Sequence, residues 1–295
     1  MPYNVPSIGD GWEFEKQKFS MSKKVDSSNN VEFGTSAQLL PMQCYKQPFV
    51  ELYNEDCLET LKRIETGSVD LMLTDPPYNV TQNEWDKPID FDALWIEWHR
   101  IVKPNGAIVI TSQQPFTTDL INSNRKNFRY DLIWEKSRCT GFLNANRMPM
   151  RSHEHILVFY RELPTFNPQK TKGNPNHISN GKISSKGKNN NYGNFEQLVR
   201  YRTEDKFPKS VIYFEQNDPN VIIHPTQKSL DLFRWLLCSY SNENDLVFDG
   251  YSGSGTTAAA CLKEKRRFIG SELSKEYFDL SVKRLEEIVR QPELF

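Results

Sequence analysis

The sequence predicts an α/β fold, in which helices pack on a mostly parallel sheet. Apolar, strand-like runs at 69–74, 107–111 and 246–248 alternate with segments whose apolar residues recur at helical spacing. One strand leads into a glycine-rich loop and then a helix-forming run, as in nucleotide-binding α/β proteins. Another strand ends in a stiff segment at 75–78, Asp-Pro-Pro-Tyr. These observations favour a sheet that carries a ligand site at one edge.

In the first half of the chain, strands and helices follow one another in turn. Residues 1–47 are polar and turn-rich, and they are predicted to form a flexible arm. Asp56 is predicted to cap the first helix, with Glu59 completing a capping box and Gly67 closing the helix. The predicted elements are a strand at 49–53, a helix through Leu58, Leu61 and Ile64, a strand at 69–74, a helix through Phe91, Leu94, Trp95, Trp98, Ile101 and Val102, and a strand at 107–111.

In the second half this alternation is interrupted. Runs at 130–135 and 155–160 are predicted to pair as antiparallel strands. Periodicity then fails from 163 to 209, and so long an irregular stretch indicates a functional excursion from the core. The pattern returns with strands at 246–248 and 267–272 and with two helices, one starting near Thr226 through Leu230, Phe233 and Leu237, the other through Phe278, Val282, Leu285 and Ile288.

Segment 75–78 combines an acid, a rigid backbone and an aromatic ring. Its two prolines fix two φ angles and remove two N–H donors, and Asp75 is kept out of the helical region because a proline follows it. A carboxylate and a free carbonyl can accept the two hydrogens of a planar amino group, while the ring stacks on the plane that carries it. The segment therefore indicates an enzyme acting on a nucleobase amino group. The alternative is an ordinary turn.

The glycine-rich loop at 248–257 reads Phe-Asp-Gly-Tyr-Ser-Gly-Ser-Gly-Thr-Thr and precedes the helix-forming run 258–262. Glycines let a ligand approach the backbone, and a helix N-terminus offers unpaired N–H groups. The loop lacks the Gly-Lys-Ser/Thr ending of a P-loop, so no triphosphate site is predicted. Glu272 follows after about 20 residues, where nucleotide folds place an acid on the ribose hydroxyls. A solvated strand end is the alternative for Glu272.

Together with the His-Pro-Thr-Gln-Lys segment at 224–228, these motifs resemble the amino-group DNA methyltransferases that use S-adenosylmethionine. The catalytic motif comes first, followed by a variable region, the 224–228 segment and the glycine loop, which is the order of the family's circularly permuted β arrangement. The resemblance spans residues 48–290. It implies a Rossmann-like methyltransferase sheet, mostly parallel with one antiparallel strand, with an inserted target-recognition region.

The resemblance also assigns roles to residues. A base flipped out of double-stranded DNA would stack on Tyr78, while Asp75 and the Pro76 carbonyl accept its amino hydrogens. Pro77 completes the catalytic set. The residues expected at S-adenosylmethionine are Asp56, His224, Thr226, Lys228, Asp249, Tyr251, Gly253, Ser254, Gly255, Thr256, Thr257 and Glu272.

Some residues depart from the family's usual motifs. Gly250 and Tyr251 stand where a proline and a phenylalanine are usual, and Ser229 stands where a proline usually follows the lysine. Gly250 is expected to make the loop more flexible and cofactor binding less tight. An aspartate at position 75 favours adenine N6 as the target, whereas a serine favours cytosine N4. Cytosine-N4 methylation is therefore the alternative activity.

Basic residues concentrate in one segment although the net charge of the chain is −1. Residues 161–210 contain ten Lys or Arg against four Asp or Glu, a net charge of about +6, which is typical of phosphate contact. A lysine-rich solvated loop is the alternative. The residues expected to contact DNA are Lys182, Lys186, Lys188, Arg200 and Arg202.

The predicted organisation has four parts. The arm at 1–47 precedes a catalytic half of the core at 48–162, a target-recognition insert at 163–220 and a cofactor-binding half at 221–295. A cognate restriction nuclease and a homodimer are further partners that the resemblance leaves open. Two activities from other classes compete with DNA methylation: DNA binding by a catalytically idle relative, and methylation of RNA or of a protein glutamine.

Other features narrow the class of protein. No apolar run approaches the ~20 residues that span a membrane, and no secretory signal is visible, so a cytoplasmic location is expected, in a bacterium or in the host of a phage. The five cysteines lack Cys-x-x-Cys spacing and indicate reduced thiols. His153 and His155 lie two residues apart with no third ligand near in sequence, so no metal site is predicted.

Overall fold

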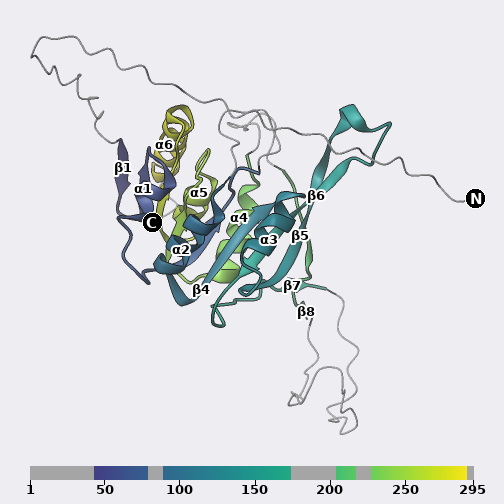
Figure 1. Cartoon of the computed structure of the whole chain (residues 1–295), viewed down its shortest axis with the longest axis horizontal. Coiled ribbons are helices and arrows are strands. Elements are labelled where there is room, and N and C mark those ends of the chain that lie inside the picture. The colour runs from purple at the N-terminus through teal and green to yellow at the C-terminus, as the bar shows by residue number, and fades with distance from the viewer. Residues whose placement is uncertain (1–42, 79–88, 174–203, 217–226, 291–295) are drawn as a thin grey trace, which may run out of the picture. The chain divides into compact units, whose positions relative to one another are not determined.

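The computed structural model describes residues 43–78, 89–173, 204–216 and 227–290. Within these residues the chain forms a nine-stranded mixed sheet in the order β1-β2-β11-β10-β3-β4-β6-β5-β9, and β7 and β8 pair separately (Figure 1). The strands are β1 (Cys44–Gln47), β2 (Val50–Tyr53), β3 (Val69–Thr74), β4 (Val102–Ser112), β5 (Phe128–Thr140), β6 (Arg151–Phe159), β7 (Thr171–Lys172), β8 (Asp205–Lys206), β9 (Val211–Phe214), β10 (Leu246–Asp249) and β11 (Arg267–Ser271).

Helices cover both faces of the sheet. One buried cluster joins the sheet to α4, α5 and α6, and a second joins it to α1, α2 and α3. The helices are α1 (Cys57–Leu61), α2 (Phe91–Ile101), α3 (Phe116–Ser123), α4 (Leu230–Tyr240), α5 (Thr256–Lys263) and α6 (Lys275–Val289), with a 3-10 turn, η1 (Phe142–Asn144). The result is a three-layer α/β/α arrangement, as the sequence predicts.

The alternation of β4 shows how the sequence specifies these layers. Ala107 and Val109 point into the cluster with α4–α6, whereas Ile108 and Ile110 point into the cluster with α1–α3. All four side chains are buried, because a strand with a helix layer on each face has no solvated side. This accounts for the uninterrupted apolar run at 107–110.

Strand direction brings the motifs to one edge. β2, β11, β10, β3 and β4 are parallel neighbours, so their carboxyl ends lie at the same edge of the sheet. β6 pairs antiparallel with β4 and β5, which confirms the predicted pair, and it is the predicted antiparallel strand. β1, at the outer edge of the sheet, pairs antiparallel with β2 and is a second antiparallel strand, which was not predicted. Its residues lie in the stretch predicted as an arm.

Several elements were not predicted. β1, α3 and β9 escape sequence reasoning because each is short or lies in a polar stretch. Asp56 caps α1 by accepting from the Leu58 N–H at 2.8 Å, as predicted, but Glu59 pairs with Lys62 rather than closing a capping box. The helix ends at Leu61, and Gly67 instead takes a positive φ of 66° in the turn before β3.

Candidate active site at the carboxyl edge

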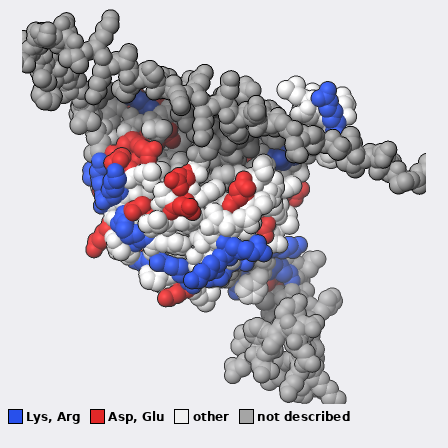
Figure 2. All heavy atoms as spheres, viewed as in Figure 1, with Lys and Arg blue, Asp and Glu red and all other residues white. Residues whose placement is uncertain are grey.

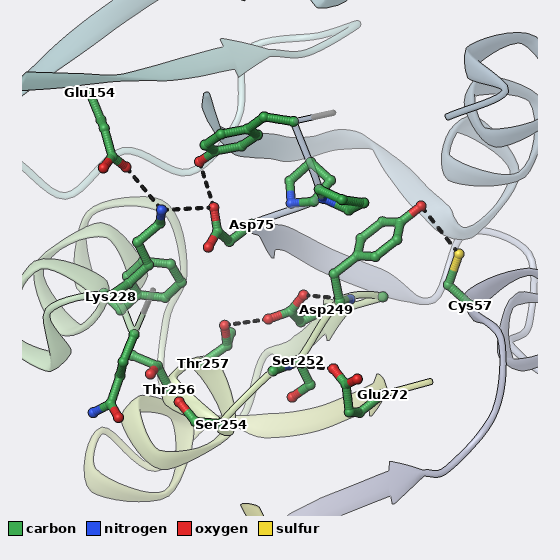
Figure 3. A pocket seen from close by; sticks show the side chains of 18 of the residues that line it. Cys57, Asp75, Glu154, Lys228, Asp249, Ser252, Ser254, Thr256, Thr257 and Glu272 are labelled. Carbon is green, nitrogen blue, oxygen red and sulfur yellow. Dashed lines mark hydrogen bonds and ion pairs between the residues drawn. The ribbon is translucent and has the colours of Figure 1, made fainter. Parts of the chain in front are cut away.

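A cavity of about 440 Å³ opens at the carboxyl edge of the sheet. It lies where β3 delivers Asp75, β10 delivers Asp249 and β11 delivers Glu272 (Figure 3). The two acidic motifs are about 175 residues apart in the chain, yet the Thr74 hydroxyl at the end of β3 donates to Asp249 at 2.6 Å. The predicted meeting of the two motifs on one sheet edge is confirmed.

Three polar groups converge on the Asp75 carboxylate. Oδ1 accepts from the Tyr78 hydroxyl at 2.6 Å and from the Thr111 hydroxyl of β4, and the Lys228 ammonium lies 3.1 Å away. Within the described residues these contacts all go to Oδ1. Burial raises the pKa of Tyr78 well above its ordinary value, and the Asp75 charge raises it further. The phenol is therefore a donor at neutral pH.

Lys228 belongs to a buried chain of alternating charges. Its ammonium lies 2.9 Å from Glu154 of β6, and Glu154 lies 3.1 Å from Lys136 of β5. Burial lowers the pKa of Lys228, but Asp75, Tyr78 and Glu154 together raise it well above its ordinary value. Burial likewise raises the pKa of Glu154, but Lys228 and Lys136 bring it below its ordinary value. Lys228 and Glu154 are thus charged at neutral pH.

At the other end of the cavity, Asp249 organises the glycine loop. Its carboxylate accepts from the Thr257 hydroxyl at 2.5 Å and from the Tyr251 N–H at 3.0 Å, in addition to Thr74. Burial raises the pKa of Asp249 to about 6, although these hydrogen bonds oppose the shift. Asp249 and Thr257, predicted as cofactor residues, both line the cavity and also tie the loop to the strand and the helix.

Glu272 is the second acid at this end. Its carboxylate accepts from the backbone N–H of Gly253 at 2.8 Å and of Ser274 at 2.7 Å. Burial raises its pKa to about 7 despite both bonds. The Ser252 hydroxyl, which also lines the cavity, is buried and has no hydrogen-bond partner among the described residues. A buried hydroxyl without a partner and two acids with raised pKa suit a polar, cationic ligand with hydroxyl groups.

The loop rests on α6. Ser281 donates to the Gly253 carbonyl at 2.7 Å, and Arg284 donates to the Ser254 carbonyl at 3.0 Å. Gly255 does not line the cavity, unlike its neighbours Ser254 and Thr256. It has a φ of 72°, and a Cβ there would lie 3.1 Å from the Ser281 side chain. Backbone conformation and helix packing therefore require glycine at 255, and its role at the cofactor stays a prediction.

The departures from the usual motif have local explanations. A Cβ built on Gly250 would lie 3.1 Å from the Cys57 Cβ, so the loop passes close to α1 at this point. The Gly250 carbonyl accepts from the Ser271 hydroxyl at 3.0 Å, which holds the residue predicted to be flexible. The Tyr251 hydroxyl, absent from the usual phenylalanine, lies 3.5 Å from the Cys57 thiol.

Most of the predicted site residues line this one cavity. They are Asp56, Asp75, Pro76, Pro77, Tyr78, Lys228, Asp249, Tyr251, Gly253, Ser254, Thr256, Thr257 and Glu272. Two predicted cofactor residues, His224 and Thr226, lie outside the described residues, as do the predicted DNA contacts Lys182, Lys186, Lys188, Arg200 and Arg202. Their roles stay predictions.

Sequence reasoning missed Lys136 and Glu154. A signal was present for Glu154, a charge just before the apolar run 156–159, and β-sheet register sets it opposite Trp134. The paired His153 and His155 rings lie 5.5 Å apart, and His155 contacts Asp131 at 3.2 Å. In the described ranges, no three His, Cys, Asp or Glu side chains are grouped as metal ligands, and no helix has the length and apolar character needed to cross a bilayer.

Comparisons with known proteins agree with this geometry. The model of the DNA methylase family, which covers N6 and N4 methyltransferases, matches residues 69–283. DNA adenine methyltransferase YhdJ of Escherichia coli is 30% identical over 245 residues, which cover 78% of this chain and 81% of the relative.

Solved structures show the same fold. The M1.HpyAVI complex with SAM is 28% identical, covers 80% of this chain and 99% of its own, and has a TM-score of 0.53. The cytosine-N4-specific PvuII DNA methyltransferase has a TM-score of 0.57 at 15% identity, covering 83% of this chain and 92% of its own, and is evidence for the fold alone. The predicted mostly parallel, Rossmann-like sheet is confirmed, whereas the circular permutation stays a prediction.

Proposed function

Because this chain belongs to the DNA methylase family, whose members methylate amino groups of DNA bases, we propose that its target is the N6 amino group of adenine. The relative at 30% identity is named a DNA adenine methyltransferase, and position 75 is an aspartate, which favours adenine in this family. These two observations support the finer assignment. The family itself contains both adenine and cytosine-N4 enzymes.

The chain uses S-adenosylmethionine, which supplies an electrophilic methyl group on a sulfonium cation. The loop end of the cavity fits this group, since Ser252 offers a buried hydroxyl and Glu272 a buried acid. We assign Glu272 to the ribose hydroxyls, because its carboxylate is already aimed by two backbone N–H groups. Asp249 holds the loop in the conformation that presents Gly253 and Ser254 to the cavity.

The opposite end handles the target base. Asp75 Oδ2 and the Pro76 carbonyl accept the two amino hydrogens, which leaves the nitrogen lone pair directed at the methyl carbon. Lys228 holds the Asp75 carboxylate in place through an ion pair, while Tyr78 and Thr111 fix its rotation by donating to Oδ1. The ring of Tyr78 packs on Phe116 with centroids 5.3 Å apart and has Lys228 Nζ 5.2 Å from its centroid, and we assign this ring to stacking on the base. Holding the amino group and the methyl group in line provides most of the rate enhancement.

The observation that carries this proposal is the Asp75 carboxylate, held on one oxygen by three groups in the same cavity as the loop acids. The test expresses the chain in a host without DNA methylation and analyses the nucleosides of its DNA by mass spectrometry. N6-methyladenine is the expected product. N4-methylcytosine would overturn the adenine assignment, and unmodified DNA would overturn the activity.

The division of the chain into parts and the identity of its partners are also proposals. The catalytic half at 48–162 and the cofactor half at 221–295 flank the insert at 163–220, whose strand β9 nevertheless pairs with β5 of the core. Double-stranded DNA is the partner that the family implies. A cognate nuclease and a homodimer stay predictions.

A further inference from the structure

The loop between β5 and β6 forms a projecting hairpin tip, residues 137–150, beside the cavity mouth. Because β5 runs in the same direction as β4, the tip leaves the sheet at the carboxyl edge (Figure 1). Thr140 at its base lines the cavity. Gln216, another lining residue, braces the tip by accepting from the Arg138 N–H at 3.1 Å and donating its own N–H to Ser137 at 3.0 Å.

The hairpin tip exposes large apolar side chains. The exposed fractions are 78% for Phe142, 97% for Leu143, 58% for Met148 and 43% for Met150. Gly141, with a φ of 89°, turns the chain into η1, which holds Phe142 and Leu143 at the end of the projection. Four such side chains on one small projection mark a surface that a partner covers, since single exposed apolar residues are common but clusters are not.

The charges around these side chains indicate the chemistry of the partner. Between Glu135 and Glu154 the sequence contains no acidic residue, while Arg138, Arg147 and Arg151 are basic. Figure 2 shows the projecting tip in white and blue, without red. Apolar tips flanked by arginines are typical of side chains that enter a nucleic acid between base steps.

We propose that the hairpin tip is a wedge that enters the DNA duplex beside the target base, with Phe142 and Leu143 filling the space that the extruded base leaves. Arg147 and Arg151 bind the flanking phosphates. This inference rests on the proposed function, which requires the base to leave the stack at a cost of a few kcal/mol. Apolar side chains between base steps offset that cost by replacing lost stacking. The wedge lies outside the insert predicted to recognise DNA.

The test uses the target sequence, which is first identified by sequencing the methylated DNA with a method that detects modified bases. It compares kcat/KM on a fully paired duplex with that on a duplex whose target adenine is mismatched and therefore already loosened. Phe142→Ala/Leu143→Ala is expected to lose roughly 10–100-fold on the paired duplex and to recover most of that loss on the mismatched one. With 2-aminopurine at the target position, the rise in its fluorescence on binding is expected to be smaller for this variant than for the wild type.

Matched variants separate a wedge from a general defect. Ile96→Ala removes a similarly exposed apolar side chain on α2, outside both the cavity lining and the insert, and wild-type rates are expected. Leu143→Asp alters one almost fully exposed side chain, so the fold is retained while the wedge is lost. Unchanged S-adenosylmethionine affinity confirms folding. Arg147→Ala/Arg151→Ala should lower the log–log salt slope of DNA binding by up to about 1.8.

Two outcomes would overturn the wedge: equal loss on both duplexes, or wild-type rates for the double variant and for Leu143→Asp. A change in oligomeric state without a change on paired DNA would assign the tip to a protein interface instead. Failure of the proposed function is distinguishable from these outcomes, because the wild type would then methylate neither duplex.

Discussion

Charge is held differently at the two ends of the cavity. At the loop end, Asp249 and Glu272 are held by hydroxyls and backbone N–H groups, and burial raises their pKa to about 6 and about 7. At the catalytic end, carboxylates alternate with ammonium groups, and Glu154 has a pKa below its ordinary value. Among the described residues that line the cavity, the loop end has no cation and suits a cationic ligand, whereas the catalytic end has Lys136 and Lys228 beside its carboxylates.

The sharpest way to break this contrast is to remove Asp75. Asp75→Ala is expected to lower kcat by about 10²–10³-fold or more, because the acceptor that orients the amino group is lost. S-adenosylmethionine binding should stay measurable by calorimetry, since Glu272 and the glycine loop are intact. Asp131→Ala, which removes a carboxylate away from the cavity, is the control. Turnover of Asp75→Ala at the control's rate would refute the mechanism.

Neutralising Glu154 tests the buried charge chain. Glu154→Gln removes the carboxylate that pairs with Lys136, and it leaves Asp75 as the described carboxylate next to Lys228. The free energy of unfolding, measured with urea at pH 7, should therefore fall by about 3 kcal/mol. The double variant Lys136→Met/Glu154→Gln should recover part of this, because it removes a buried ammonium as well. Equal stability of Glu154→Gln and the wild type would mean that the chain of charges is not coupled.

The loop end predicts a pH dependence that the catalytic end does not. Burial raises the pKa of Glu272, so the protein without ligand binds its proton more tightly when folded, and this contribution to stability falls as pH rises from about 4.5 towards 7. A cationic ligand binds better when Glu272 is ionised, so its affinity rises with pH whereas the stability of the ligand-free protein falls. The Kd for S-adenosylmethionine should fall roughly tenfold between pH 6 and pH 8.

Two variants check this assignment. Glu272→Gln should weaken binding at pH 8 and flatten the profile above pH 7, leaving the smaller dependence that Asp249 causes near pH 6. Glu276→Gln, which removes an exposed carboxylate four residues away, should keep the wild-type profile. A profile for Glu272→Gln that matches the wild type would place the titrating group elsewhere.

The smallest expected effect concerns Gly255. Gly255→Ala should cost about 1–2 kcal/mol of stability, because the residue must keep a positive φ and its Cβ would press on Ser281. The Kd for S-adenosylmethionine should rise only slightly, because the substitution affects the ligand only through a shift of the loop. Gly67→Ala, at another positive φ but with nothing within 4 Å of the added Cβ, is the comparison. A large loss of affinity without a loss of stability would instead mean that the ligand approaches residue 255 directly.

The sequence by itself determined the layers of the fold and the identity of most cavity residues. Period-2 runs buried on both faces and helical periodicity are local properties, and the Asp-Pro-Pro-Tyr and glycine-loop motifs carry their chemistry in adjacent residues. The expectation that both motifs meet at one edge also needed only the rule that parallel strands share their carboxyl ends.

Tertiary structure decided what depends on register between distant strands. The charge chain through Lys136, Glu154 and Lys228 forms because β5, β6 and the segment before α4 converge, and no local pattern encodes that convergence. The need for glycine at 255 comes in part from Ser281 of α6, which lies 26 residues away in the sequence. The apolar hairpin tip reads as ordinary loop sequence, and its position beside the cavity follows from the direction of β5 in the folded sheet.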